Sequence, residues 1–428
     1  MTHTGYQHAP DFDAPLAAMR LIGSFFIAFG VFLSGFVISE PAPYELMMVG
    51  QVALWFLLGL RLSRTVVLLL CLLLAFNIGG YLSLTTMADL DEGPLYLAVS
   101  TFLALTSVFY AAIIEDRYQR LLLIFRAWLA AAVITSLLGI IGYFHAIPGF
   151  EVFTLYDRAK GAFQDPNVFG PFLVTPSLYL IYGLLTGKTM HAPWRILGLL
   201  ILSLGVFLSF SRAAWGLFLF ATVLLVFVMM LKERTAAFRL KILVLFLIAA
   251  GLMVAAVLIA LQFKQVADLF SSRASAVQSY DGGHLGRFAR HYLGFLLAME
   301  HPLGIGPMVF DNIFPAAEHN IWLKSLTTHG WFGFVIYLVL ICWTIAAGFR
   351  HLLRPRPWQA FLIISWVAFV GHVMIGAVID TDHWRHFFLL LGILWGCMAL
   401  EKREGVRLAH KQLTLRNLPR FHAFSPRF

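Results

Sequence analysis

The segment TVVLLLCLLLAFNIGGYLSL, residues 65–84, decides the fold class of this chain. It carries no charged residue and is long enough for an α-helix to cross the hydrocarbon core of a bilayer. The sequence therefore predicts an all-α integral membrane protein with about 12 transmembrane helices, since such runs recur along the chain. They lie near residues 17–38, 44–60, 65–84, 93–114, 121–142, 167–186, 195–210, 213–231, 242–262, 330–349, 359–378 and 386–400.

Composition excludes other classes of protein. The chain has 428 residues, of which 60% are hydrophobic and only 12% charged, and this excludes a soluble globular protein. The net charge of +9 is spread over short connections, so it predicts topology rather than a nucleic-acid partner. Cys71, Cys342 and Cys397 lie inside apolar runs, which argues against a disulfide framework or a zinc site. The first apolar run, 17–38, is too long for a cleavable signal.

The basic connections predict the orientation of the chain. The first two opposite loops, 39–45 and 85–93, carry acidic residues and no Lys or Arg. By the positive-inside rule, the basic side is the cytoplasm, and both termini lie there. We expect a single membrane domain, 1–428, with a long outer loop at 263–329 and a basic cytoplasmic tail at 401–428. The basic connections lie near residues 61–64, 117–120, 188–195, 232–241, 350–356 and 402–411.

Several cations break this charge rule because they fall on the predicted outer side. Polar side chains close to a membrane are costly and are commonly functional. An anionic ligand is the simplest reason for cations that topology does not require. The residues concerned are Arg158, Lys160, Arg212, Arg273, Arg287, Arg290, Lys324 and Arg385.

The first polar motif is RAKGAFQDPN, residues 158–167. Pro166 should hold the preceding Asp outside helical geometry, and Asn167 can cap the helix that follows. Free amides at that helix start would face an anion, with Arg158 and Lys160 as added cationic donors. The alternative is an ordinary loop whose Asp-Pro-Asn only starts a helix.

The second motif is SFSR, residues 209–212, between two apolar runs with almost no loop. This places Arg212 at the outer boundary of the membrane. The planar fork of an arginine can bind phosphate through two parallel hydrogen bonds. The alternative is a snorkelling anchor or a stop between two spans.

The third motif begins in the long outer loop, where GRFARHYLGFLLAME, residues 286–300, predicts an amphipathic helix. The turn HPLGIGPMVF, 301–310, follows it. Arg287, Arg290 and His291 share one face of the helix. The apolar residues that recur at helical spacing are Leu285, Phe288, Tyr292, Phe295 and Leu296.

Further along this loop, Asn320 is a natural N-cap for another short helix. His319 would then lie beside the positive helix end, which favours the neutral imidazole that a general base requires. A lone histidine is more often structural, but this one stands outside an apolar bundle with several arginines nearby in sequence.

The fourth motif is Asp380-Thr-Asp382-His383-Trp-Arg385, between two late runs. Asp-x-Asp is a metal-diphosphate pattern in some glycosyltransferases. The alternatives are an ion pair with an outer arginine or hydrogen bonds that orient His319. We favour pairing and orientation over a metal site.

Taken in order, RAKGAFQDPNVFG (158–170), SFSRAAWG (209–216), GRFARHYLGFLLAMEHPLGIGP (286–307) and HNIWLKSLTTHGWFG (319–333) carry a resemblance. Over roughly residues 60–400, the chain resembles the O-antigen ligase and O-antigen polymerase superfamily, which includes exopolysaccharide polymerases. The resemblance implies a multi-pass glycosyltransferase of the bacterial inner membrane, acting at the periplasmic face. Its donor would be a glycan on undecaprenyl pyrophosphate, and its acceptor the lipid A core or another lipid-linked glycan.

The resemblance also implies roles for particular residues and no metal or cofactor. Arg158, Arg212 and Arg287 would hold the pyrophosphate, and His319 would be the base in a direct attack that inverts the anomeric centre. We add further substrate-binding and supporting candidates, which are Lys160, Asn167, Arg290 and Asn320, and Asp380, Asp382, His383 and Arg385.

The main alternatives remain open. A single long outer loop favours a ligase over an O-antigen or exopolysaccharide polymerase. A polysaccharide or lipid transporter would be expected to show internal repeats or charges at mid-membrane depth. The apolar runs hold few such charges, with Arg126 the clearest exception.

Overall fold

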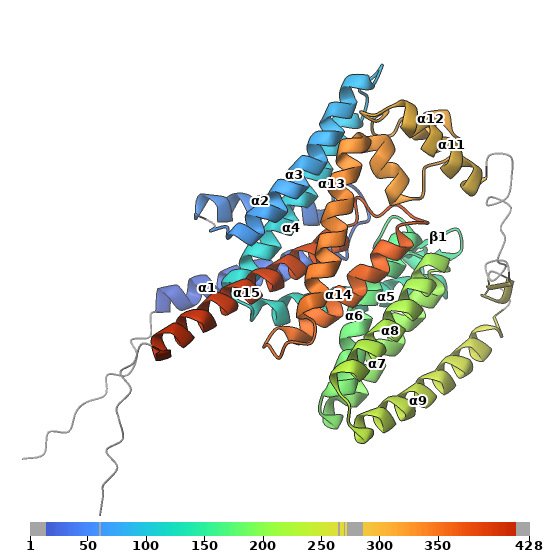
Figure 1. Cartoon of the computed structure of the whole chain (residues 1–428). Coiled ribbons are helices and arrows are strands. Elements are labelled where there is room, and N and C mark those ends of the chain that lie inside the picture. The colour runs from blue at the N-terminus through green and yellow to red at the C-terminus, as the bar shows by residue number, and fades with distance from the viewer. Residues whose placement is uncertain (1–13, 60, 264–265, 269, 272–285, 417–428) are drawn as a thin grey trace, which may run out of the picture.

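The computed structural model describes residues 14–59, 61–263, 266–268, 270–271 and 286–416, and its helices dominate the molecule (Figure 1). Within these ranges the one small sheet pairs β1 (Thr154–Leu155) antiparallel with β2 (Arg158–Ala159). The predicted all-α class is therefore confirmed. Of the predicted outer loop and the basic tail, residues 264–265, 269, 272–285 and 417–428 lie outside the described residues.

Each predicted apolar run falls on one helix. Seven of the helices in the described ranges, α3 to α8 and α13, are long and apolar enough to cross a membrane. This confirms an integral membrane protein. The helices are α1 (Ala14–Leu33), α2 (Pro43–Leu57), α3 (Arg64–Ser83), α4 (Gly93–Asp116), α5 (Arg120–Tyr143), α6 (Pro166–Thr186), α7 (Ala192–Leu208), α8 (Arg212–Lys232), α9 (Ala236–Ala260), α13 (Ile321–His351), α14 (Gln359–Ile375) and α15 (Arg385–Arg416).

The helices pack in two connected groups. In the first, α15 runs along α4, and α13 runs along α3. In the second, α6 packs against α7 and α8, while α5 contacts both α7 and α1. Helix α14 joins the groups, because it contacts α8 and α6 on one side and α15 on the other. Helix α9 lies at the periphery, where it contacts α6 (Figure 1).

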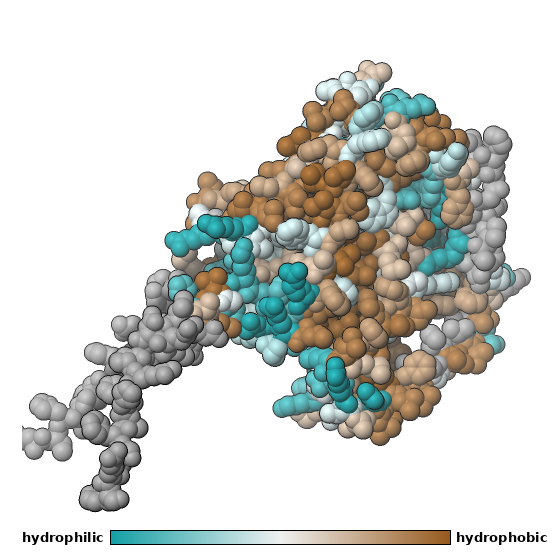
Figure 2. Space-filling view, in the orientation of Figure 1, coloured by the Kyte–Doolittle hydropathy of each residue, from teal (hydrophilic) through white to brown (hydrophobic). Residues whose placement is uncertain are grey.

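Apolar side chains cover much of the outer surface of the bundle. Figure 2 shows brown, hydrophobic residues over large parts of the visible face, whereas teal residues gather mainly at its ends and edges. A soluble protein rarely exposes continuous apolar area of this kind. The surface is that expected of helices whose outer faces contact lipid.

Helix α13 is kinked at Gly330, and the kink separates a short first helix from the long membrane span, as predicted. Gly330 has φ 65° and ψ −174°, a conformation that is essentially restricted to glycine. The turn after α11 (Arg287–Glu300) fills the kink. Trp331 N donates to Pro302 O at 2.9 Å, and Ile305 N donates to Thr327 O at 2.7 Å. These bonds fix the first helix of α13 relative to the loop that precedes it.

Candidate functional site

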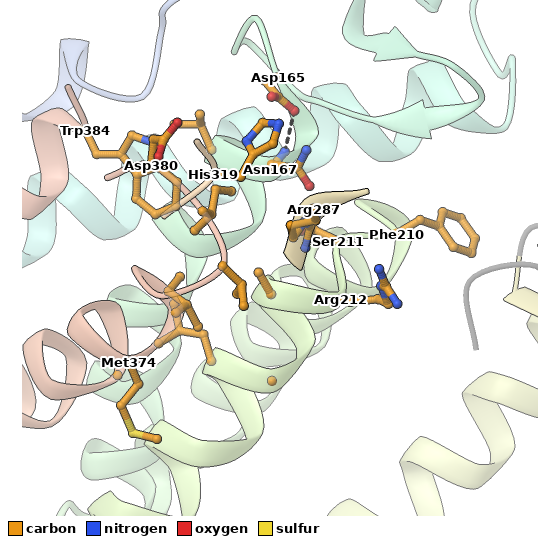
Figure 3. Close-up of a pocket in the computed structure, with 18 of the residues that line it drawn as sticks. Asp165, Asn167, Phe210, Ser211, Arg212, Arg287, His319, Met374, Asp380 and Trp384 are labelled. Atoms are coloured by element: carbon orange, nitrogen blue, oxygen red, sulfur yellow. Dashed lines mark hydrogen bonds between the residues drawn. The ribbon is translucent and has the colours of Figure 1, made fainter. Parts of the chain in front are cut away.

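A cavity of about 1210 Å³ lies where loop segments far apart in the sequence meet the ends of α6, α8 and α14 (Figure 3). It brings together most of the residues that the sequence singled out. Five of the predicted residues do not line it, and these are Lys160, Asn320, Asp382, His383 and Arg385. The predicted residues that do are Arg158, Asn167, Arg212, Arg287, Arg290, His319 and Asp380.

Arg158 joins three segments of the cavity wall. It lies in β2 and is 7% exposed. Its Nε donates to Ser209 O at 2.7 Å, and its Nη2 donates to Asn167 Oδ1 at 2.9 Å. The planar guanidinium thus fixes the hairpin, the start of α6 and the turn before α8 to one another.

The start of α6 differs in one detail from the prediction. Asp165, not Asn167, is the N-cap: its Oδ1 accepts from Asn167 N at 2.7 Å. Proline has a fixed φ that suits the first helical position, so Pro166 is the first helical residue and the cap is Asp165, two residues before Asn167. Asp165 lies outside helical geometry, with φ −129° and ψ 130°, as predicted. The side chain of Asn167 is consequently available to accept from Arg158.

Arg212 is the first residue of α8, and the cap before it is local. Ser211 Oγ accepts from Ala214 N at 3.4 Å, and Phe210 has φ 45° in a tight turn out of α7. This geometry brings Arg212 into the cavity lining without an intervening loop. Figure 3 shows Arg212, Ser211 and Arg287 together on one side of the pocket.

Helix α11 turns its cationic face inward. Arg290 is 6% exposed, and its Nε and Nη1 find no hydrogen-bond partner among the described residues. Buried donors without a partner are costly, so an anion at this position would satisfy them. The apolar face points away from the protein: Phe288 and Tyr292 are each 65% exposed. Leu285, on the predicted apolar face, lies outside the described residues.

His319 lies in the turn that starts α13 and has the left-handed φ of 48°. Asn320 is the N-cap, as predicted, and its Oδ1 accepts from Trp322 N at 3.0 Å. Burial lowers the pKa of His319, Asp380 partly offsets this, and Arg287 and Arg290 lower it further. The imidazole is therefore neutral at neutral pH, the form that can accept a proton.

The Asp380 and Asp382 carboxylates pair with a lysine, so the predicted arginine partner is wrong. Lys324 Nζ lies 3.7 Å from Asp380 Oδ2 and 3.4 Å from Asp382 Oδ2. Arg385 is unavailable to them because its Nε donates to Glu45 Oε1 at 2.5 Å. In the described part of the chain, no three His, Cys, Asp or Glu side chains are grouped to hold a metal ion.

Asp380 also contacts the turn that carries His319. Its Oδ1 accepts a hydrogen bond from Asn320 N at 2.9 Å. His383 lies behind this contact, with Nδ1 3.2 Å from Asp382 Oδ2. The hydrogen bonds therefore fix the backbone beside His319, which is close to the orienting role that the sequence suggested.

Two residues of the site were not among the sequence candidates. Lys324 was recognised only as an outer cation, although it lies one helical turn after Asn320. Glu318 directly precedes His319 and is 4% exposed; Thr327 Oγ1 donates to its Oε1 at 2.8 Å. Burial raises the pKa of Glu318 to about 7, partly offset by Lys324. The sequence signal that could have identified Glu318 is its position directly beside the predicted base.

The other half of the cavity is apolar. Leu217 and Phe220 from α8 line it together with Met374 and Ile375 from α14. The cavity thus has a cationic end formed by loops and an apolar wall formed by membrane helices. Such a lining suits an amphiphile with an anionic headgroup.

Fold and site together define a multi-pass helical membrane protein with an amphiphilic, arginine-rich pocket. Residues 197–338 match the family model Wzy_C, described as O-antigen ligase. The match confirms the resemblance to the O-antigen ligase and polymerase superfamily over this segment, which includes Arg212, Arg287, Arg290 and His319. No curated protein matches the chain.

Proposed function

We propose that this protein is an O-antigen ligase-type glycosyltransferase. It transfers a glycan from undecaprenyl pyrophosphate to a sugar of the lipid A core at the periplasmic face of the inner membrane. Both termini lie in the cytoplasm. The observation that carries the proposal is a single cavity that combines a neutral histidine, an arginine cluster and an apolar helix wall.

The donor fits the two halves of the cavity. The pyrophosphate binds at the cationic end, where Arg212, Arg287 and Arg290 converge on the lining. The unpartnered Nε and Nη1 of Arg290 are donors for its oxygens. The polyprenyl chain lies along α8 and α14, so its apolar surface leaves water.

The chemistry is a direct displacement. His319 accepts the proton of the acceptor hydroxyl while that oxygen attacks the anomeric carbon. The bond from this carbon to the pyrophosphate oxygen breaks, and undecaprenyl pyrophosphate leaves with the bonding electrons as an anion. A single attack inverts the anomeric centre.

General magnitudes for such groups set the scale of the effect expected from each residue. Arginines stabilise the developing negative charge, and the loss of one donor in comparable sites costs about 3–4 kcal/mol of transition-state stabilisation. A positioned general base typically contributes about a hundred- to ten-thousand-fold in rate.

The test is the glycan output of a deletion strain that carries His319→Ala or Arg212→Ala. We expect both variants to lose surface O-antigen at normal protein abundance, while long undecaprenyl-linked glycan accumulates. Arg350→Ala is the matched control, because Arg350 is an exposed arginine at the opposite end of α13. Normal output from both pocket variants contradicts the mechanism.

A gel of the surface lipopolysaccharide from the deletion strain, beside an assay of undecaprenyl-linked glycan, separates ligase from polymerase. Loss of every O-antigen band together with long lipid-linked polymer identifies a ligase. A retained single-repeat band without the ladder identifies an O-antigen polymerase. An unchanged lipopolysaccharide profile with loss of exopolysaccharide identifies an exopolysaccharide polymerase.

A further inference from the structure

A buried polar network lies behind His319, and Asp380 is the member of this network that also lines the cavity. Its centre is Lys324, in the first helix of α13, whose side chain is only 15% exposed. The network reaches Asp380 and Asp382, between α14 and α15, and Tyr96 in α4. Three elements distant in sequence therefore meet at one ammonium group.

Lys324 is shared between two carboxylates and held by an aromatic ring. Its Nζ lies 3.7 Å from Asp380 Oδ2, 3.4 Å from Asp382 Oδ2 and 5.4 Å from the centre of the Tyr96 ring. The Tyr96 hydroxyl donates to Asp382 Oδ2. His383 Nε2 lies 3.2 Å from Tyr96 O, which fixes its ring beside Asp382.

The network contains more negative than positive charge, so Lys324 determines the state of its carboxylates. Burial raises the pKa of Asp380; Lys324 lowers it, and the neighbouring Asp382 raises it again. Burial alone would also raise the pKa of Asp382, but Lys324 and then His383 hold it well below its usual range. Without a cation, two close carboxylates raise one another's pKa, so one of them keeps its proton to a higher pH.

The network ends at the backbone beside the base. Asp380 uses one oxygen toward Lys324 and the other to accept from Asn320 N at 2.9 Å. An ionised carboxylate makes a stronger bond of this kind than a protonated one. The charged groups that act on His319 are Asp380 from this network, Arg287 and Arg290 from α11, and Lys324 itself.

We propose that Lys324 is a positioning residue of the transfer reaction, which keeps Asp380 ionised and thereby holds the His319 turn in its active geometry. This inference rests on the proposed function for the role of His319. The active form then has a neutral His319 and an ionised Asp380. The Lys324 ammonium disfavours proton binding at both His319 and Asp380. Its loss therefore raises the pH at which both groups are deprotonated.

The first test needs no substrate. The full-length wild-type protein and Lys324→Met are purified in detergent, and their melting temperatures are compared at pH 5 and pH 8. Without the ammonium, the folded state must bury two carboxylates that lack their lysine partner, and this penalty appears as pH rises above their unfolded pKa. We expect Lys324→Met to lose more thermal stability at pH 8 than at pH 5. An equal loss at both values overturns the electrostatic role.

The second test is the pH dependence of transfer in membrane vesicles that contain the full-length protein. The probe is radiolabelled undecaprenyl-pyrophosphate-linked glycan from the strain that encodes the protein. We expect the acidic limb of the Lys324→Met profile to move up by roughly one pH unit or more. Lys324→Arg keeps the charge and should return the limb toward its wild-type position. An unmoved limb, or equal loss of activity at every pH, overturns the proposal.

A further variant and a control keep the result interpretable. Asp382→Asn removes the carboxylate that raises the pKa of Asp380, so it should move the acidic limb of the transfer profile to lower pH. If Lys324→Met does not fold, the presence or absence of this shift decides the proposal. Lys241→Met is the control, because among the described residues Lys241 Nζ donates only to Leu185 O, at 2.8 Å. A wild-type protein that transfers no glycan contradicts the proposed function, while the melting comparison still decides the charge role of Lys324.

Discussion

Arg158 and Asn167 are joined by a 2.9 Å hydrogen bond from the guanidinium Nη2 to the side-chain Oδ1, across the boundary between the β-hairpin and α6. The same guanidinium donates to Ser209 O at 2.7 Å. One side chain therefore sets the spacing of two cavity walls.

Arg158→Lys should lose both glycan transfer and stability, although it keeps the positive charge. An ammonium cannot reproduce the planar fork that reaches Ser209 and Asn167 together. We expect transfer to fall at least tenfold and the free energy of unfolding by about 1–3 kcal/mol. Vesicle assays and thermal melting measure the two effects. Lys160→Ala is the comparison, because Lys160 does not line the cavity; equal losses in the two variants would contradict this prediction.

The pH profile of the wild-type enzyme should reflect the buried base. Burial lowers the pKa of His319 below its usual 6.5, so the neutral form persists as pH falls through 6.5. Transfer should decline only at lower pH. Asp380 raises the pKa of His319, hence Asp380→Asn should move this decline lower still and reduce the rate at every pH. A wild-type decline centred above 6.5 is inconsistent with His319 as the base.

Glu318→Gln should stabilise the protein at alkaline pH. Burial raises the pKa of Glu318 from 4.5 to about 7, so the folded state loses stability as pH rises from the lower value to the higher. The amide keeps an oxygen for the Thr327 hydroxyl and carries no charge. At pH 8 the gain should be up to about 3 kcal/mol, with little gain at pH 4. Chemical unfolding in detergent measures it, and a pH-independent difference between the proteins would refute the assignment.

Gly330→Ala should disrupt the start of α13. Gly330 has φ 65°, and an added Cβ would lie 2.6 Å from the carbonyl carbon of Leu303. With this Cβ present, the kinked backbone at residue 330 and the packing of the preceding loop against it cannot both be kept. We expect a loss of at least about 1–3 kcal/mol and of transfer. Gly50→Ala is the control, because a Cβ there meets nothing within 4 Å. Similar melting temperatures for the two variants would show that the kink tolerates a side chain.

The fold class was predictable because a span needs only length and apolar composition. The caps at Asn320 and the amphipathic α11 were predictable because their signals are local. The helix start at Asn167 was misplaced by two residues, since both Asp165 and Asn167 are good caps and only the geometry around Pro166 decides between them. Such a choice depends on the backbone rather than on residue type.

The site was less predictable where partners are distant in sequence. The cavity gathers arginines from separate loops, and their excess on the predicted outer side was the visible signal. The pairing of Lys324 with Asp380 depends on how α13 and α14 pack, which no local pattern encodes. The inward orientation of Arg290 was equally hidden, because an amphipathic pattern does not say which face meets the protein.

Helix α11 carries Arg287 and Arg290 on its protein side and turns Phe288 and Tyr292 outward. Whatever surrounds the protein at those rings, lipid or detergent, therefore contacts the same helix that carries the two arginines of the pocket. Replacing a bilayer with a detergent changes what contacts the outer face of α11, and this can shift the helix even when every residue of the pocket is intact. Turnover measured in lipids of different headgroup and in micelles would therefore compare forms of the same protein that differ in the position of α11.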